Sequence, residues 1–576
     1  GASWLVTGNT STSRCGGTMT GSADTLVENG TCSGGTNRGI ALFNSLTALQ
    51  NNGAVIPTHA PMRGSSAIDA ASDCRGLTSD ERGNARPADG DRNGSALCDP
   101  GAVEYRSITV DTTIDGGGTD GQCSLREAIL NANANLVIAP DCAVGSGADT
   151  IEFSITTPAT ITLGSALPQI SESLGIYGPG EAALTINAVG GSPHFVFDDG
   201  DNNVDQPMQL QGMTLINGTG PGTGSVYSSE ALAVDRMTFS GNVGTGANAG
   251  GAITQSQGLL SINRSTFSGN QSTSGAGGAV VARNTDSVEV NESSFQQNSA
   301  AGSGGGLALI VAGAVQLQRS TFSGNTSGSP GGAVMVQAGT QLEATNSTFS
   351  GNQGPGQGGT VFVTGSLAVL DAHHLTFRGN SAGAGLALRI VNSATVNLSD
   401  SILSAGGVAG NQCSISGGTL NAQGTNLVTD SSCAGITSTG AGAIGLAAEL
   451  ADNGGSTRTH ALLPGSAAID AATDCAGITI DQRGIGRGGD GDLDGVGACD
   501  IGAYELVPLV VNTVADTVDS ADSLCSLREA MANANADNRG NPDCARGLGA
   551  DLIYFNLPIP STITLGSSLP QISDAL

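Results

Sequence analysis

The chain has 576 residues, of which 89 are glycine and only 3% are aromatic, a composition typical of short strands joined by tight turns. Its net charge of −29 argues against nucleic acid as a partner, and the absence of lysine excludes Schiff-base chemistry and lysine isopeptide bonds. No run of about 18 apolar residues is present, so we expect no membrane span in this fragment.

A large repeat organises the chain. The stretch 122–135 (QCSLREAILNANAN) returns as 524–536 (LCSLREAMANANA), and the stretch 63–73 returns as 464–474. We therefore expect one complete module of about 400 residues with parts of its two neighbours. In chain order, we expect the end of a preceding module with its acidic block at 1–106, a capping segment at 107–148, a parallel β-helix at 149–410, a second acidic block at 411–507, the next capping segment at 508–548, and the start of the next β-helix at 549–576.

Each capping segment carries the start signal of a helix. Ser124 and Glu127 form an S-x-x-E capping box, which returns at Ser526 and Glu529. Apolar residues follow at i, i+3, i+4 and i+7, the spacing of one helix face. Because a β-helix exposes an apolar cross-section and open strand edges at its ends, we interpret each segment as a helix that covers the amino end of a solenoid. An ordinary surface helix would show the same pattern.

A shorter period of 27 or 28 residues runs through the module. It spaces two series of residues, one aromatic and one polar: Phe239, Phe267, Phe295, Phe322, Phe349 and Phe377, and then Asn242, Asn270, Asn298, Asn325, Asn352 and Asn380. One coil of a parallel β-helix has this length, and successive coils stack at about 4.8 Å. The fold class is therefore all-β, a parallel β-helix in tandem modules with short capping helices. We expect an inward stack of phenylalanines and a hydrogen-bonded asparagine ladder.

Glycine pairs recur with the same period, each just before a short apolar strand, beginning with Gly250-Gly251 and Gly277-Gly278. We expect glycine here because it tolerates the positive φ values that sharp corners need.

Three resemblances follow from these motifs. The F-x-x-N and G-G-A-[ILV] pattern resembles the repeats of chlamydial polymorphic outer-membrane proteins, and residues 123–128 (CSLREA) resemble the CSLREA domain of bacterial surface proteins. Residues 453–504 resemble the choice-of-anchor Q domain. Together the resemblances imply a right-handed parallel β-helix at a cell envelope and, for the polymorphic proteins, a role as an adhesin. No C-terminal anchor or autotransporter barrel is recognised in this sequence, so the mode of attachment stays open.

Twelve cysteines recur in pairs with the module. An interval of 24 residues separates Cys74 from Cys98 and Cys475 from Cys499, and an interval of 19 separates Cys123 from Cys142 and Cys525 from Cys544. The third pair is Cys15 and Cys32, 17 residues apart, and it corresponds to Cys413 and Cys433, 20 residues apart. An even number in recurring pairs predicts disulfides formed in an oxidising compartment, hence a secreted, extracellular or cell-surface protein. The connectivity is inferred from the recurrence, because six cysteines permit 15 arrangements. A metal site is less well supported because no C-x-x-C is present and histidine is rare.

An acidic loop in each block matches part of a calcium-binding pattern. Alternating carboxylates around a glycine supply the hard oxygen ligands that Ca²⁺ prefers, although the final glutamate of an EF-hand is absent. The predicted ligands are Asp490, Asp492, Asp494, Val496 and Asp500, and in the first copy Asp89, Asp91, Asn93, Ser95 and Asp99. A solvated acidic turn held by the neighbouring cysteine is the alternative. Calcium is the one cofactor that we expect.

An active site is not expected. Polysaccharide-degrading β-helix enzymes need carboxylates gathered on neighbouring coils. The acidic residues of the solenoid, which include Asp235, Asp286, Glu289, Glu292, Glu343 and Asp371, do not line up at one phase of the coil in this interpretation. Glu152 becomes Tyr554 in the second copy, which argues against catalysis. His59 and His460 recur with the module, as expected for a structural hydrogen bond, and the pair His373-His374 fits turn or surface packing.

The sequence thus predicts a non-catalytic extracellular rod, stalk or filament of a bacterial surface, and the resemblance to the polymorphic proteins implies that it is part of an adhesin. Its expected partners are further copies of itself, through neighbouring modules or head-to-tail association, and host or environmental glycans. A β-helix protein that binds or degrades polysaccharide is the alternative function.

Overall fold

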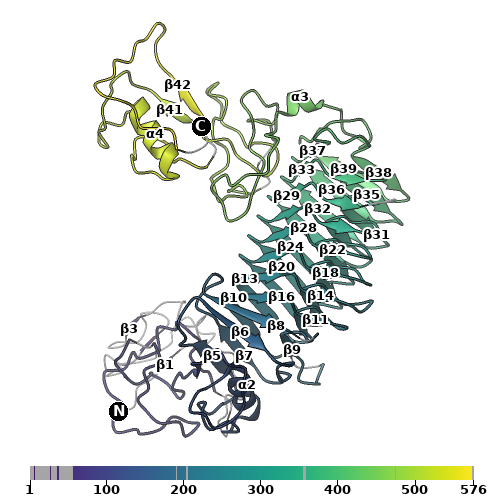
Figure 1. Ribbon diagram of the computed structural model, residues 1–576. Helices are drawn as coiled ribbons and strands as arrows, with labels where there is room; N and C mark the ends of the chain where they lie inside the picture. Colours follow the sequence, from purple (N-terminus) through teal and green to yellow (C-terminus); the bar gives the residue numbers. More distant parts are fainter. Residues whose placement is uncertain are drawn as a thin grey trace, which may run out of the picture. The chain divides into compact units, whose positions relative to one another are not determined.

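The computed structural model describes residues 56, 58–91, 93–189, 191–202, 205–354, 358–473, 475, 477–549 and 551–573, and the backbone of three short strands before residue 56. They form two compact units, residues 1–189 with 195–214 and residues 190–194 with 215–576. Parallel strands stack into a β-solenoid of about ten turns with very little helix, which confirms the predicted fold class (Figure 1). Among the described helices, none has the length and apolar character that crossing a membrane requires.

The first unit holds the strands that open the solenoid. Its elements are β1 (Leu5–Val6), β2 (Leu26–Val27), β3 (Thr36–Asn37), β4 (Ile108–Val110), α2 (Leu125–Ala134), β5 (Asp149–Phe153), β6 (Ala159–Leu163), β7 (Leu174–Tyr177), β8 (Leu184–Ala188), β9 (Phe195–Phe197) and β10, which begins here and spans Met208–Ile216. Parallel pairing runs from β4 to β5, from β5 to β7 and from β7 to β10, while β6 pairs with β8.

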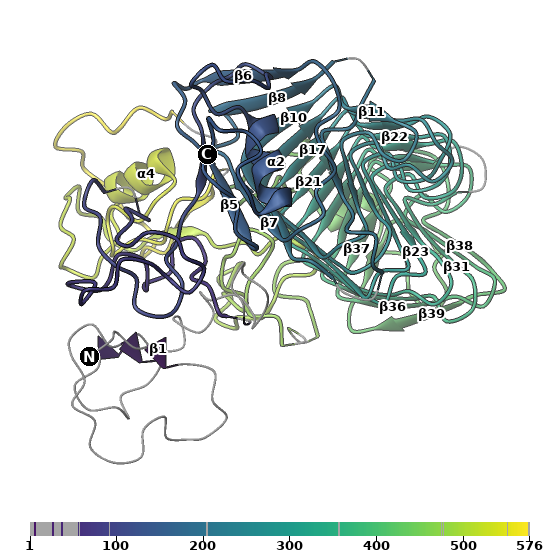
Figure 2. The ribbon, with the colours of Figure 1, turned by 90° about the horizontal axis from the view of Figure 1, so that it is seen from below.

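Helix α2 begins at the predicted capping box. The Ser124 side chain accepts a hydrogen bond from the Glu127 backbone N–H, and the Glu127 carboxylate accepts one from the Ser124 backbone N–H. The buried face includes Leu125, Ala128 and Ile129, as the periodicity predicts, and it packs against β4 and β5. Figure 2 shows the helix beside β5. In the second unit, α4 (Leu527–Ala536) repeats this capping box with Ser526 and Glu529. The helix and its capping box are confirmed in both copies.

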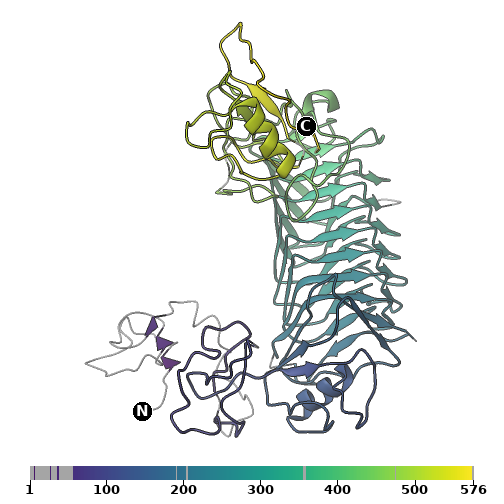
Figure 3. The same ribbon diagram turned by 60° about the vertical axis from the view of Figure 1, so that its left-hand side comes forward.

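The second unit contains most of the coils, each contributing a short strand to several parallel sheets (Figure 3). Two neighbouring columns form one sheet: β13 (Leu232–Ser240), β16 (Leu259–Asn263), β20 (Ser287–Asn291), β24 (Ala314–Gln318), β28 (Gln341–Thr345), β32 (Val369–His373), β36 (Thr395–Ser399) and β39 (Thr419–Gln423); and β17 (Thr266–Ser268), β21 (Ser294–Gln296), β25 (Thr321–Ser323), β29 (Thr348–Ser350), β33 (Thr376–Arg378), β37 (Ile402–Ser404) and β40 (Leu427–Val428).

Two further sheets complete the coils. One contains β11 (Thr219–Gly220), β14 (Val243–Gly244), β18 (Gln271–Ser272), β22 (Ser299–Ala300), β26 (Thr326–Ser327), β30 (Gln353–Gly354) and β34 (Ser381–Ala382). The other contains β12 (Val226–Ser228), β15 (Ile253–Gln255), β19 (Val280–Arg283), β23 (Leu307–Ile310), β27 (Val334–Val336), β31 (Val361–Thr364), β35 (Leu388–Val391) and β38 (Cys413–Ser416). After the coils come α3 (Ala441–Ile444), β41 (Leu509–Val511), α4 and β42 (Ile553–Phe555).

The six phenylalanines form the expected stack. They pair in register from Phe239 to Phe377, and each is at most 1% exposed. Neighbouring ring centroids lie 4.5–5.2 Å apart with the planes tilted by 4–13°. The inter-strand spacing brings the rings into van der Waals contact along the solenoid.

The six asparagines form the expected ladder. In the middle rung, Asn298 Nδ2 donates to Asn325 Oδ1 at 2.9 Å, and Asn298 Oδ1 accepts from Asn270 Nδ2 at 3.0 Å. The same side chain donates to the Phe267 carbonyl and accepts from the Asn270 backbone N–H. Every rung from Asn242 to Asn352 donates to the next asparagine in this way, so buried polar turns are satisfied coil by coil.

The glycine pairs have a second cause that the sequence interpretation missed. Gly277 and Gly304 do adopt positive φ, but Gly251 and Gly278 do not. A Cβ at Gly251 would lie 1.9 Å from the Gly278 carbonyl oxygen, and one at Gly278 would lie 2.0 Å from the Gly305 oxygen. These glycines are required because successive coils approach each other closely at this point.

The corner between the two strand columns also departs from expectation, since in seven successive coils it carries a residue other than glycine. The residues with positive φ there are Arg236, Arg264, Glu292, Arg319, Asn346, His374 and Asp400, at φ values of 44–51°.

All disulfides among the described residues follow the predicted pairing: Cys74–Cys98, Cys123–Cys142, Cys413–Cys433, Cys475–Cys499 and Cys525–Cys544. The pair Cys15 and Cys32 lies outside the described residues. We refer to residues 58–106 as the first disulfide block and to residues 446–507 as the second disulfide block.

The second disulfide block packs against the coils of its own solenoid. Its apolar core includes Leu446, Ile469 and Ile501 and continues into Ile402 and Leu427 of the last coils. Polar contacts extend this interface to earlier coils along a row of threonines in register. Thr348 Oγ1 donates to Gln482 Oε1, Gln482 Nε2 donates to Thr321 Oγ1, and the Ala503 N–H donates to Thr376 Oγ1, at 2.7–2.9 Å.

Candidate functional site

The second disulfide block is built on buried ion pairs. Arg483 contacts Asp481 at 2.8 Å with both side chains at most 1% exposed, and its guanidinium lies 3.6 Å from the centre of the Tyr504 ring. Arg487 contacts Glu505 at 3.1 Å and is equally buried. Because an isolated buried charge is costly, each of these groups depends on its partner.

A buried carboxyl closes each block. Asp500 accepts hydrogen bonds from the backbone N–H groups of Asp470 and Leu506, and burial, followed by the nearby charge of Glu505, raises its pKa. Asp99 accepts from Asp69 and Tyr105 in the same way, and burial raises its pKa to about 7. These two predicted calcium ligands therefore have internal hydrogen-bonding roles.

The first disulfide block repeats the ionic arrangement. Arg82 contacts Asp80 at 2.9 Å and Arg86 contacts Glu104 at 3.3 Å, with all four side chains buried. The sequence interpretation missed these groups. Their recurrence at the same offset in both copies was the available signal, because buried ion pairs that a fold requires recur whenever the fold does.

Each block also gathers three carboxylates near its acidic loop. In the second block, ligand-capable oxygens of Asp470, Asp490 and Asp492 lie within 4.8 Å of one another. Asp470 Oδ2 accepts hydrogen bonds from the Gly491 and Asp492 backbone N–H groups, which hold the loop against it. Asp490 Oδ1 is buried and has no hydrogen-bond partner among the described residues.

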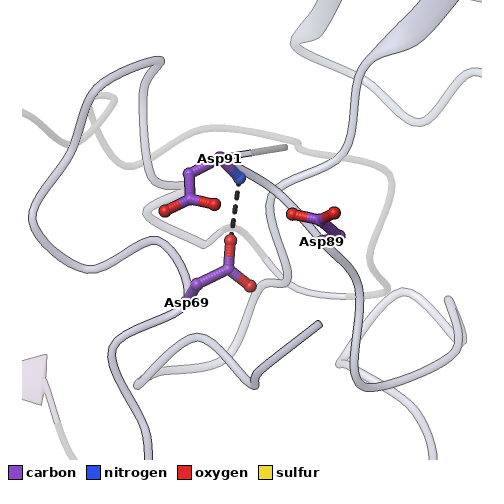
Figure 4. Close-up of side chains that lie close together, drawn as sticks. All are labelled: Asp69, Asp89 and Asp91. Atoms are coloured by element: carbon purple, nitrogen blue, oxygen red, sulfur yellow. Dashed lines mark hydrogen bonds between the residues drawn. The ribbon is translucent and has the colours of Figure 1, made fainter. Parts of the chain in front are cut away.

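The first block forms the equivalent group from Asp69, Asp89 and Asp91 (Figure 4). The Asp91 backbone N–H donates to Asp69 Oδ2 at 2.8 Å, the contact drawn in that view. Asp69 and Asp470 were not predicted as ligands, although both lie in the repeated A-I-D-A-A stretch. Three carboxylates offer the hard oxygen donors that Ca²⁺ takes, so the donor set fits that ion.

The remaining predicted ligands lie elsewhere in the loops. Asp494 Oδ1 accepts from the Val496 backbone N–H, and Asn93 Oδ1 accepts from the Ser95 N–H, both as local turn contacts. The structure therefore brings together Asp490 with Asp492, and Asp89 with Asp91, and it does not bring these other residues into the same groups.

Two histidines, His460 and His374, serve the packing of the second block. His460 Nδ1 lies 3.0 Å from the Ala447 carbonyl oxygen and its Nε2 lies 2.9 Å from Ser350 Oγ. Burial, followed by the charge of Arg378, lowers its pKa to about 4. His374 is likewise buried, and its Nδ1 faces the Asp500 carbonyl oxygen. The expected structural role is found for His460, whereas its counterpart His59 is exposed.

The acidic residues of the solenoid correct one interpretation. Glu289, Glu343 and Asp371 do share one phase of the coil, because they occupy one row in register through Gln316. The row points outward, and Glu289 and Glu343 are exposed. The alignment of these carboxylates was overlooked because the glutamine interrupts it.

Comparison with known proteins adds little beyond the fold. No family model and no curated protein matches the chain. Two solved structures are similar, the A-modules of the mannuronan C-5 epimerases AlgE6 and AlgE4 from Azotobacter vinelandii, at 12% and 13% identity. They cover 54% and 57% of this chain and 98% of each A-module, with TM-scores of 0.21 and 0.23. Similarity this low carries no inference about activity. The chain is an all-β parallel β-helix protein that carries disulfides.

Proposed function

We propose that the chain is a non-catalytic segment of an extracellular rod or stalk on a bacterial surface, assembled from modules in tandem. The observation that carries the proposal is the unbroken register of the phenylalanine and asparagine series. Side chains stacked in this way resist bending, because any tilt between coils would open ring contacts and hydrogen bonds together.

The disulfides support an extracellular location. The disulfides among the described residues indicate an oxidising compartment, and they recur at equivalent places in the module. The buried ion pairs recur with them. We therefore propose a secreted or cell-surface protein whose neighbouring modules, or further copies joined head to tail, are its main partners. An adhesin would use such a stalk to hold a binding region away from the cell.

Electron microscopy tests the rod. The chain is compared with a longer chain in which residues 107–508 are present twice. A coil rise of about 4.8 Å gives each ten-turn solenoid a length of about 5 nm. We expect the longer chain to show two solenoids at a constant separation and angle. Freely rotating globules, or turnover of a polysaccharide by the same preparation, would contradict the proposal.

We also propose that the three carboxylates of each disulfide block bind Ca²⁺. The buried, unpartnered Asp490 Oδ1 supports this, together with the recurrence of the group in the first block. Isothermal titration of the whole chain should give two sites, and Asp490→Asn and Asp89→Asn should each remove one of them. Absence of heat at millimolar Ca²⁺, or an unchanged stoichiometry in both variants, refutes the site.

A further inference from the structure

A cleft of about 600 Å³ lies within the first unit, between the first disulfide block and the strands β5 and β7. This volume is in the range of small-ligand sites. The side chains that matter for its chemistry are Arg63, Ser65, Asp91, Tyr105, Glu152 and Tyr177. The ion-pair networks and the phenylalanine stack make no use of this cleft.

Arg63 is held in place from two sides. Its Nε donates to Glu152 Oε1 at 2.6 Å, and its guanidinium lies 5.1 Å from the centre of the Tyr177 ring. The ring is fixed in turn, since a Cβ at Gly175 would lie 2.6 Å from it and its hydroxyl donates to Gln209 Oε1 at 2.7 Å.

The terminal nitrogens of Arg63 remain available to a ligand. Its side chain is 48% exposed, and no described residue accepts a hydrogen bond from either terminal nitrogen. A donor pair that is already oriented loses little freedom when a ligand arrives, which favours binding.

Tyr105 also lines the cleft and carries a buried hydroxyl. The residue is 5% exposed, and its hydroxyl is buried without a well-formed hydrogen bond among the described residues, although the Thr150 side chain interacts with it. Burial, followed by the charge of Glu152, raises its pKa, so the hydroxyl stays neutral and can donate. A buried donor of this kind costs free energy until it gains a partner.

The second copy of the module shows that the fold does not require these groups. It keeps Ser466, Ile469, Gly491 and Asp492 at the positions of Ser65, Ile68, Gly90 and Asp91, but it has Pro464, Leu506 and Tyr554 at the positions of Arg63, Tyr105 and Glu152. The framework is shared, whereas Arg63, Tyr105 and Glu152 are replaced in the second copy. That difference argued against catalysis common to all modules, and it fits a ligand particular to one.

We infer that this cleft binds a neutral saccharide with vicinal hydroxyls. The Arg63 terminal nitrogens donate to such a pair, while the Glu152 carboxylate beside them accepts from it. One guanidinium facing two carboxylates, on a chain of net charge −29, disfavours an acidic sugar. The inference does not depend on the rod, because a globular protein would present the same cleft.

Calorimetry and saturation-transfer NMR on the whole chain test this binding. The probes are neutral oligosaccharides of glucose, mannose and galactose, with glucuronate and galacturonate as acidic counterparts. A chelator keeps the outcome independent of any calcium site. We expect millimolar or tighter binding of at least one neutral oligosaccharide and weaker binding of both acids.

Three variants locate the site. Arg63→Ala should weaken binding at least tenfold, and Tyr105→Leu about fivefold, as expected for the loss of one or two hydrogen bonds. Tyr105→Leu introduces the residue that the second copy already carries, so the fold should survive. Arg236→Ala, an exposed arginine of the second unit, is the matched control. The inference fails if no neutral saccharide binds, if the acids bind as well, or if Arg63→Ala binds like the parent chain.

Discussion

The asparagine ladder makes a quantitative prediction at its middle rung. Asn298→Ala removes four hydrogen bonds: two donated by its Nδ2, to Phe267 O and Asn325 Oδ1, and two accepted by its Oδ1, from Asn270. Asn325 Oδ1 keeps the Asn298 backbone N–H, and Asn270 Nδ2 keeps the Phe239 carbonyl. The Asn270 backbone N–H and the Phe267 carbonyl lose the bonds that Asn298 supplied.

The expected destabilisation follows from this inventory. Four bonds at a net value of about 1 kcal/mol each, with an added cost for the buried groups left behind, give a loss of about 4–6 kcal/mol. Asn263→Ala is the matched control, because that asparagine lies in the same solenoid but is only half-buried. It makes one hydrogen bond of 3.0 Å, to Ser261, and one of 3.4 Å, from Asn291. We expect the control to cost less than about 1 kcal/mol.

Urea unfolding followed by far-ultraviolet circular dichroism measures both free energies. Hydrogen exchange should also lose protection in the coils on either side of Asn298, because each repeat of a solenoid contacts mainly its neighbours. If Asn298→Ala is no less stable than Asn263→Ala, the ladder does not stabilise the coils and the reasoning fails.

Three further predictions address other parts of the molecule. Gly305→Ala places a Cβ 2.2 Å from a backbone carbonyl of the next coil and should prevent or strongly impair folding. At Gly351, which has a positive φ, the added Cβ of Gly351→Ala meets open space, so this variant should cost only about 1 kcal/mol. Equal melting temperatures for the two variants would refute the prediction. Because folding lowers the His460 pKa to about 4, the stabilisation that neutral His460 contributes is complete above pH 6.5 and is lost as the pH falls towards 4, with about 2 kcal/mol lost by pH 5. His460→Gln should flatten this part of the plot of unfolding free energy against pH. An unchanged slope between pH 7 and 5 would count against the prediction. Replacing Cys475 and Cys499 together by alanine should lower stability by about 3 kcal/mol, measured against the parent chain under oxidising conditions, and an equal midpoint would exclude a stabilising role.

The repeated elements were predictable because they obey a period. The phenylalanine and asparagine series recur every 27 or 28 residues. Because each period forms one coil, equivalent side chains stack directly above one another along the solenoid. The same logic would have revealed the acidic row, since Glu289, Glu343 and Asp371 lie at that spacing, but the neutral Gln316 between them hid it.

The glycine pairs show where local reasoning stops. The recurrence of Gly251 in the sequence indicates that glycine is needed there. It does not indicate whether the cause is a positive φ or the close approach of a neighbouring backbone. Here the answer is the carbonyl oxygen of Gly278, an atom one coil away that only the stacked structure brings within reach.

The carboxylate groups were only half predictable for a related reason. The loop supplied Asp490 and Asp492 through its alternating pattern, whereas Asp470 joins them from about twenty residues upstream. Its side chain reaches the loop because it accepts the Gly491 and Asp492 N–H groups. Asp500 was assigned to the loop by spacing alone, and burial gives it a hydrogen-bonding role instead.

The packing of the second disulfide block had no periodic signal, and it changes how a tandem array should respond to mutation. Single polar residues such as Gln482 and His460 join the block to several coils, so each contact is specific to its site. The coils themselves are held by repeated contacts, of which any one is a small part. Loss of a contact within the block should therefore detach it from the solenoid while the coils stay folded, whereas loss of a rung should loosen the coils on either side. Local exchange measurements distinguish these two responses.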